Sequence, residues 1–243
     1  MKRAAVAIGA SVLVIGAFVS SSGASAQDAP VCGDPNVELL DATIVGTPGP
    51  DVLNGTPGPD VIVGLGGNDR IRGLNGDDVI CGDEGNDVIE GGTGQDLLIG
   101  DSAVADEPPP FADSNGSNDD IIRGGSGNDT LAGLSGDDTL DGGSGDDTII
   151  GFGGEDDISA GSGNDTVFGG PRADFIRGGS GNDELWGNFG GDFIRGEGGD
   201  DLVDGDNPFT DPPPPLPEFA DGPDTCSGGT GTNTVVNCET IRP

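Results

Sequence analysis

Hydrophobic and polar positions follow one another along this chain with a period of nine residues. Starting at Gly46, successive blocks read GTPGPDVLN, GTPGPDVIV, GLGGNDRIR, GLNGDDVIC, GDEGNDVIE and GGTGQDLLI. After an interruption the register resumes at Gly124 and runs without a slip to Asp204. A repeat of fixed period indicates that one small structural unit is stacked many times.

Two positions of the block keep the same chemistry throughout. Position 6 is acidic and position 8 is aliphatic, as in Asp147 and Ile149. Position 1 is Gly except at Ala160, and position 4 is Gly except at Arg172. The aspartates at position 6, with two that re-enter the register after interruptions, are Asp51, Asp60, Asp69, Asp78, Asp87, Asp96, Asp120, Asp129, Asp138, Asp147, Asp156, Asp165, Asp174, Asp183, Asp192, Asp201 and Asp224.

The pattern is G-G-x-G-x-D-x-U-x, where U is a large aliphatic residue. With blocks such as GGSGNDTLA at 124–132, the chain resembles the RTX, or hemolysin-type, calcium-binding repeat family. The resemblance covers residues 46 to about 236 and implies an all-β fold, a parallel β-roll (β-solenoid) with two repeats per coil. It implies a turn at positions 1–6, a short strand at positions 7–9, and Ca²⁺ between turns of successive coils. The implied ligands are backbone carbonyls and the position-6 aspartates named above.

The residues themselves favour the same ion. Calcium takes six to eight oxygen ligands from carboxylates and carbonyls in a flexible arrangement. Glycine permits the positive-φ conformations that turn several carbonyls toward one point. An acidic side chain fixed at one phase of a Gly-rich nonapeptide therefore supplies both kinds of ligand at once.

Composition makes the ion necessary for folding. The chain of 243 residues contains 49 Gly and 18 Pro, only 32% of it is hydrophobic, and its formal net charge is −35. Such a chain cannot bury enough apolar surface to fold without a bound ion. In the absence of an ion, its composition is typical of a disordered acidic spacer. We expect it to fold on binding about ten or more Ca²⁺ ions, because metal-binding free energy then becomes folding free energy.

The same composition excludes several classes of function. A strongly acidic chain lacks the basic patches that nucleic acids and anionic membranes require. The absence of His removes Ser–His and Cys–His nucleophiles and His-ligated zinc. We find no catalytic constellation and expect no enzyme activity.

The N-terminus has the layout of a secretory signal peptide. Lys2 and Arg3 precede an apolar run from Ala4 to Val19, and Ala24-Ser25-Ala26 offers a cleavage site before Gln27. We expect a signal peptide at 1–26, an N-terminal cap segment at 27–45, the calcium-binding roll at 46–236 and a C-terminal tail at 237–243. No stretch after the signal is apolar for long enough to span a membrane. The protein is thus expected to be secreted, with attachment to the cell surface left open.

Four cysteines lie in the exported part, an even number that suits two disulfides. Three pairings are possible for Cys32, Cys81, Cys226 and Cys238. Local closure favours Cys226–Cys238 and leaves Cys32–Cys81, while reduced thiols are the alternative.

Four blocks depart from the pattern at these positions. Pro48 and Pro50, like Pro57 and Pro59, occupy positions 3 and 5 of the first two blocks, as rigid ligands or as an N-terminal cap. Arg172 stands at a position-4 Gly, and its guanidinium is a candidate to fill the calcium site of Asp174. Asn233 replaces Asp in the last block, which we expect to weaken or abolish a site there.

Two Pro-rich insertions interrupt the register, at 100–117 and 205–222. Counted as blocks they are both odd, which places them on the same edge of the roll, five coils apart. They are either tolerated surface loops or a device for binding a partner.

Two features of the strand faces are also in register. On one sheet, position 7 carries a row of threonines, Thr130, Thr148 and Thr166. On the other sheet, Phe175 aligns with Phe193, and Arg177 aligns with Arg195 beside them. The Phe–Arg face is either cross-strand packing on a solvated surface or a contact for a glycan or protein.

Three functions fit the sequence. The first is a secreted calcium-binding repeat protein with a structural or cell-surface role. The second is a calcium-dependent adhesion or ligand-binding module that uses the Pro-rich loops or the Phe–Arg face. The third is an accessory module of a polysaccharide-active enzyme. We expect this function less than the other two, because the sequence shows no second domain.

Overall fold

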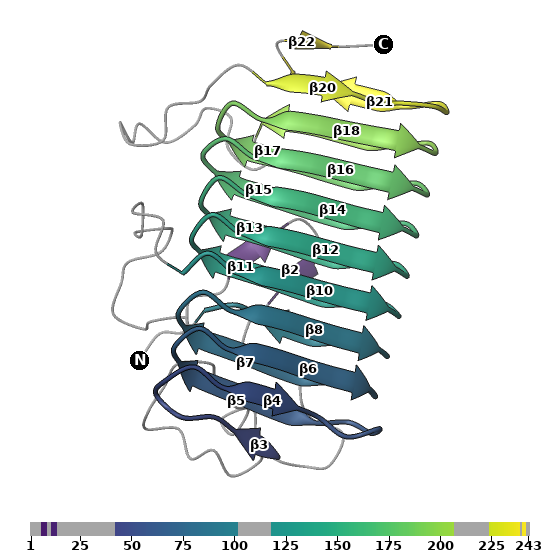
Figure 1. Cartoon of the computed structure of the whole chain (residues 1–243). Coiled ribbons are helices and arrows are strands. Elements are labelled where there is room, and N and C mark those ends of the chain that lie inside the picture. The colour runs from purple at the N-terminus through teal and green to yellow at the C-terminus, as the bar shows by residue number, and fades with distance from the viewer. Residues whose placement is uncertain are drawn as a thin grey trace.

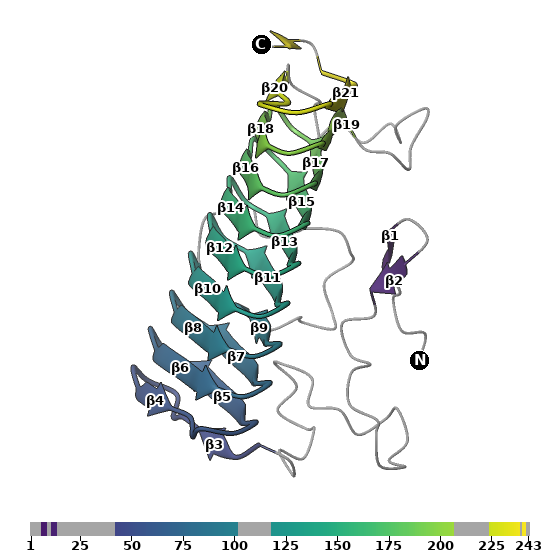
Figure 2. The same cartoon turned by 90° about the vertical axis from the view of Figure 1, so that its right-hand side faces the viewer.

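The chain winds into a parallel β-roll built of two sheets (Figure 1). The structure, a computed structural model, describes residues 6–8, 11–13, 42–101, 118–206, 224–238 and 240–241. Successive strands alternate between the two sheets, which stand as two columns when the molecule is turned (Figure 2). The predicted all-β fold and the parallel β-roll are confirmed.

Each sheet has ten strands, and we call them the even and the odd sheet after their strand numbers. The even sheet contains β4 (Val52–Asn54), β6 (Arg70–Asn75), β8 (Val88–Thr93), β10 (Ile121–Ser126), β12 (Thr139–Ser144), β14 (Asp157–Ser162), β16 (Phe175–Ser180), β18 (Phe193–Gly198), β20 (Thr225–Ser227) and β22 (Thr240–Ile241). The odd sheet contains β3 (Ile44–Val45), β5 (Val61–Gly66), β7 (Val79–Glu84), β9 (Leu97–Ile99), β11 (Thr130–Ser135), β13 (Thr148–Gly153), β15 (Thr166–Pro171), β17 (Glu184–Phe189), β19 (Leu202–Asp206) and β21 (Thr234–Val236).

The pairing register shows two repeats per coil. In β12 and β14, Leu140 lies opposite Ile158, which is two blocks further along the chain. The pairing extends beyond the predicted range 46–236 at both ends, through β3 and β22. A separate antiparallel pair joins β1 (Val6–Ile8) and β2 (Ser11–Leu13).

The strands are longer than the sequence indicates. Most of them cover six residues, from position 7 through position 3 of the next block, so the turn is confined to positions 4–6. The expectation of a strand at positions 7–9 alone was wrong, because the residues at positions 2 and 3 also pair across coils, as Gly143 does with Gly125. Glycine at these positions disguised the strand, since it is normally depleted from strands.

The interior of the roll is a single column of position-8 side chains. Ile71, Ile89, Leu131 and Ile176, among others, are completely buried, and Leu53 of the first coil is half-buried. Each coil thus contributes one aliphatic side chain from each sheet, the narrow core that the nonapeptide predicts. A smaller apolar cluster, on the outer face of the odd sheet, contains Cys81 and Ile99.

The interruptions and one cysteine pair lie where the sequence predicts. The described chain is interrupted after β9 and again after β19, strands of the same sheet five positions apart in its order. Residues 102–117 and 207–223, with the Pro-rich runs, lie outside the described residues, as do the predicted signal peptide's side chains. Cys226 and Cys238 form a disulfide with a Cα–Cα distance of 6.0 Å. Cys81 is also disulfide-bonded, while Cys32 lies outside the described residues.

No helix in the described ranges is long and apolar enough to cross a membrane.

Candidate metal centres

The turns of the roll have a recurrent backbone conformation. From the third block onward, outside the two interrupted blocks, the described residues at positions 2 and 4 have positive φ, as in Gly143 (103°) and Gly145 (136°). Glycine adopts this left-handed conformation without steric penalty. Leu65 (82°) and Phe152 (70°) adopt it as well, which shows that the turn geometry is imposed by the stack.

One oxygen of each position-6 carboxylate ties successive coils together. The backbone N–H of Asp138 donates to Oδ1 of Asp156 at 2.8 Å, and the same bond recurs at every coil. The bonds form two ladders, one along each edge of the roll. The first ladder contains Asp51, Asp69, Asp87, Asp120, Asp138, Asp156, Asp174, Asp192 and Asp224. The second contains Asp60, Asp78, Asp96, Asp129, Asp147, Asp165, Asp183 and Asp201, and ends on Asn233.

The ladders place Asp120 and Asp224 in register after the interruptions, as the sequence predicts. Asp87 donates from its backbone N–H to Oδ1 of Asp120 at 2.7 Å, although 33 residues separate them. Asp192 does the same to Asp224 at 2.8 Å. The insertions therefore leave the stack of turns unbroken.

The second carboxylate oxygen, Oδ2, is buried and accepts no hydrogen bond in most of these turns. A buried carboxylate oxygen without a donor or a cation is strongly unfavourable, so each such atom points to a positive ligand. The residues concerned include Asp69, Asp78, Asp87, Asp96, Asp120, Asp129, Asp138, Asp147, Asp156, Asp165, Asp174, Asp183 and Asp201.

Carbonyl oxygens converge on the same places. A Cβ atom added to Gly151 at position 1 would lie 2.2 Å from Oδ2 of Asp156 and 2.6 Å from the carbonyl oxygen of Gly169 in the next coil. The same arrangement recurs at Gly133, beside Asp138 and Gly151. A carboxylate oxygen that lacks a donor and lies close to a carbonyl oxygen suits a hard cation such as Ca²⁺.

Burial and repulsion between neighbouring carboxylates disfavour the ionised form of the aspartates in the turns. Burial raises the pKa of Asp87, Asp96, Asp147 and Asp156 to about 7, and neighbouring carboxylates add to the shift. In Asp138 burial, reinforced by Asp156 and Asp120, raises the pKa to about 10. A divalent cation beside these groups would reverse the balance, because it stabilises the charged form.

The described residues contain no group of three or more Asp, Glu, Cys or His side chains placed to hold a metal ion by themselves. Each turn supplies one position-6 carboxylate beside the main chain. Backbone carbonyls must therefore provide much of the coordination. This division of ligands agrees with what the Gly-rich sequence predicts.

Comparison with known families agrees with this geometry. The model of the RTX calcium-binding nonapeptide repeat matches residues 45–80, 82–103, 114–149, 133–167 and 168–203. The chain belongs to the RTX calcium-binding repeat family. RTX repeats bind Ca²⁺ at multiple sites, and the buried Asp-rich turns of this roll fit the ion. A comparison with curated proteins finds no match.

The first two turns of this RTX roll are built differently from the others. Thr47 donates to Oδ2 of Asp51 from its backbone N–H at 2.6 Å and from its hydroxyl at 2.9 Å. Thr56 donates its backbone N–H to Oδ2 of Asp60, a bond that lowers the pKa of that carboxyl. Neither block has positive φ at positions 2 and 4. Of the two roles that the sequence leaves open for the Pro-containing turns, these hydrogen bonds favour the cap.

The structure does not favour Arg172 as the group that fills the site of Asp174. Arg172 adopts a φ of 84° and is exposed, while Oδ2 of Asp174 is buried and accepts no hydrogen bond. The arginine thus reproduces the backbone of glycine at position 4 and leaves the carboxylate oxygen available to a cation. Asn233 keeps the ladder bond from Asp201 at 2.8 Å but offers no charge.

Two groups of polar residues escaped the sequence analysis. Position 5 forms an outer ladder in the opposite sense, in which the N–H of Asn164 donates to Oδ1 of Asp146 at 2.8 Å. The recurrence of Asn and Asp at position 5 could have indicated it. Asp83 and Asp101, at position 2, are also buried, and Oδ2 of Asp101 accepts a hydrogen bond from Ser135. The nonapeptide pattern gives no signal for these two.

Proposed function

We propose that this RTX protein is secreted and that it folds outside the cell when Ca²⁺ fills the turns of its roll. The buried Oδ2 atoms support the proposal most directly, because the calcium-free roll would hold one uncompensated carboxylate oxygen in turn after turn. Without the ion these groups favour an expanded chain. Extracellular calcium modules bind with dissociation constants near 10⁻⁴–10⁻³ M, which suits folding after export.

The proposed ligands are the interior position-6 aspartates, from Asp69 to Asp224 in the two ladders, together with position-1 carbonyls such as that of Gly169. The proposed role is that of a non-catalytic scaffold at or near the cell surface. The signal-like N-terminus supports export.

A calorimetric calcium titration followed in parallel by far-UV circular dichroism tests the proposal. We expect about ten or more ions to bind and β-structure to appear over the same calcium range. Binding of only one or two ions, or full β-structure before calcium is added, would refute it. Recovery of the protein from the culture medium with Gln27 as its first residue tests export.

An adhesive role is the second candidate. It is favoured by the Phe–Arg face, where Phe175 and Phe193 stack with their ring centroids 4.9 Å apart. Retention of the protein on cells in calcium, and its release by a chelator, would distinguish adhesion from a purely structural role.

A further inference from the structure

The outer face of the even sheet carries an ordered aromatic and basic ladder. Phe175 and Phe193 are stacked with an interplanar angle of 2°, as their predicted register requires. The guanidinium carbons of Arg177 and Arg195 each lie 4.6 Å from the ring centroid of the phenylalanine on their own strand. The four side chains therefore form one rigid patch, because stacking and cation–π contacts fix each against its neighbours.

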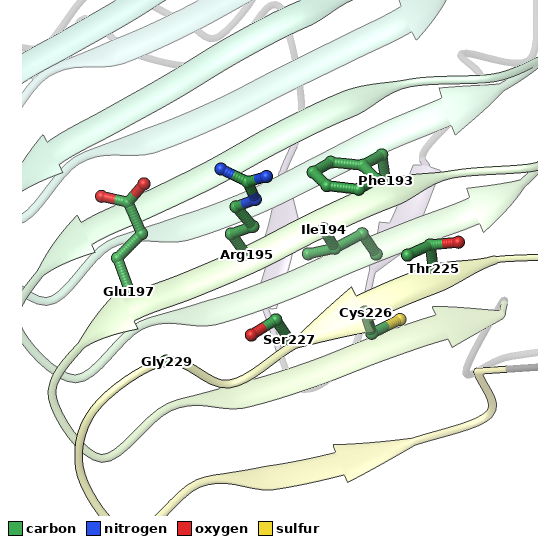
Figure 3. Close-up of a pocket in the computed structure, with 8 residues that line it drawn as sticks. All are labelled: Phe193, Ile194, Arg195, Glu197, Thr225, Cys226, Ser227 and Gly229. Atoms are coloured by element: carbon green, nitrogen blue, oxygen red, sulfur yellow. The ribbon is translucent and has the colours of Figure 1, made fainter. Parts of the chain in front are cut away.

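The ladder ends abruptly at β18, and a groove opens beside it. On the next strand, β20, the short side chains of Thr225 and Ser227 lie opposite Phe193 and Arg195 of β18 (Figure 3). The groove has a volume of about 310 Å³, with the buried Ile194 and Cys226 beneath it. That volume is at the lower end of the range for small-ligand sites, which suits one or two sugar rings.

The polar groups of the groove are of mixed kind. Arg177 is engaged in an ion pair with Asp157, whereas Arg195 forms no ion pair within the described residues and is exposed. Glu197 and the hydroxyls of Thr225 and Ser227 also line the groove. Arg195 lies next to Phe193 along β18, Thr225 and Ser227 lie on the neighbouring strand, and Glu197 lies at the far end of the groove from Phe193 (Figure 3).

We propose that this groove binds a pyranose unit of an uncharged polysaccharide. The apolar face of that sugar would pack on Phe193 while its hydroxyls accept from Arg195, and a hydroxyl of the next unit would donate to Glu197 at the other end of the groove. An acidic ligand fits less well, since Glu197 lies in the groove and the whole chain carries a formal charge of −35. The inference needs the folded, calcium-loaded roll but is independent of where the protein acts.

Affinity electrophoresis of the full chain, in calcium, tests the proposal. Gels contain galactomannan, xylan or a mixed-linkage β-glucan, and a parallel gel contains polygalacturonate. The variants are Phe193→Ala and Arg195→Met. The matched control is Phe168→Ala, which removes the equivalent stacked ring (4.7 Å from Trp186) on the odd sheet.

We expect at least one uncharged polysaccharide to retard the protein, and each groove variant to weaken binding about tenfold or more. Phe168→Ala should bind as the parent does. Retardation by none of the uncharged polymers, by polygalacturonate alone, or unchanged retardation of both groove variants would overturn the proposal. Circular dichroism of each variant in calcium identifies a folding failure, and calcium titration of the same samples tests the calcium account separately.

Discussion

At the scale of the residue, each interior position-6 aspartate has two distinct tasks. Its Oδ1 accepts the backbone N–H of the preceding coil, and its Oδ2 lies close to position 1 of its own block, as Oδ2 of Asp156 lies beside Gly151 without a hydrogen-bond donor. The nine-residue phase identified these aspartates and the buried aliphatics without a structure. The phase could not show that Oδ1 and Oδ2 have different roles, because these roles depend on how the coils stack and not on spacing along the chain.

A side chain at position 1 should cost calcium where the neighbouring oxygens lie close, as they do at Gly151, although Ala160 shows that one turn accommodates a methyl group. In Gly151→Ala the new Cβ would meet Oδ2 of Asp156 at 2.2 Å and the Gly169 carbonyl at 2.6 Å. We expect the variant to bind about one ion fewer and to lose about 1–3 kcal/mol in its free energy of unfolding in calcium. Calorimetry and thermal unfolding measure the two effects.

The control for this change is Gly58→Ala. Gly58 has open space around its Cβ direction and no positive φ, so its substitution should change neither the stoichiometry nor the stability appreciably. A full complement of calcium in Gly151→Ala would show that the space beside position 1 is not part of a site.

At the scale of the element, similar nonapeptides form two kinds of turn. The GTPGPD turns satisfy their carboxylates with Thr donors, whereas the Gly-rich turns leave an oxygen-lined space. Proline at positions 3 and 5 marks the difference in the sequence, but the threonine bonds that settle it required coordinates. The six-residue strands likewise emerged only from cross-coil pairing, since local propensity ends a strand at glycine.

Asp60 and Asp78 are neighbours in the same ladder and form a matched pair. Asp78→Asn should bind about one calcium fewer, because it removes the charge of a buried oxygen that has no donor. Asp60→Asn should leave the calcium stoichiometry unchanged, since Thr56 already donates to that carboxylate. Calorimetric titration decides; equal losses in both variants would show that the Pro-containing turns bind calcium too.

The Cys226–Cys238 disulfide should stabilise the last coil alone. Cys226→Val with Cys238→Ala keeps an aliphatic side chain at the buried core position and removes the cross-link. Loop-closure entropy for this short loop gives a loss of about 3 kcal/mol. Hydrogen exchange should accelerate in β20 and β21 and remain unchanged in β10 to β16. Acceleration along the whole roll would contradict a local role.

At the scale of the whole molecule, the fold is an acidic scaffold whose interior is partly aliphatic and partly ionic. The buried apolar core of the described residues consists largely of one narrow column of position-8 side chains. The sequence predicts this architecture because every coil repeats the same unit. The groove beside β18 was less accessible to prediction, because it arises where large side chains on one strand meet small ones on a strand 32 residues away.

Acid should affect the calcium-free and calcium-bound protein in opposite directions. Burial raises the pKa of Asp87, Asp96, Asp147 and Asp156 from 3.8 to about 7 in the roll, so the folded state binds more protons than the unfolded chain. Their contribution to the free energy of unfolding without calcium is therefore fully present below about pH 4 and is lost as pH rises through about 7.

Far-UV circular dichroism of the calcium-free protein between pH 3 and pH 8 measures this effect, with light scattering as the control for precipitation near the isoelectric point of 4.1. We expect β-structure to increase toward acid. The affinity for calcium should instead decrease as the pH is lowered, because protons compete with calcium for the same carboxylate oxygens. A calcium-free protein that is most ordered at pH 8 would contradict the assignment of buried carboxylates.

Small-angle scattering of the full chain in excess calcium and in excess chelator tests the central claim most directly, because it measures compactness itself. A compact fold of this size has a radius of gyration of about 20 Å, and an unfolded chain of this length approaches about 50 Å. We expect the compact value in calcium and expansion toward the larger value in chelator. The same compact radius in both conditions would show that the roll holds itself together without the ions.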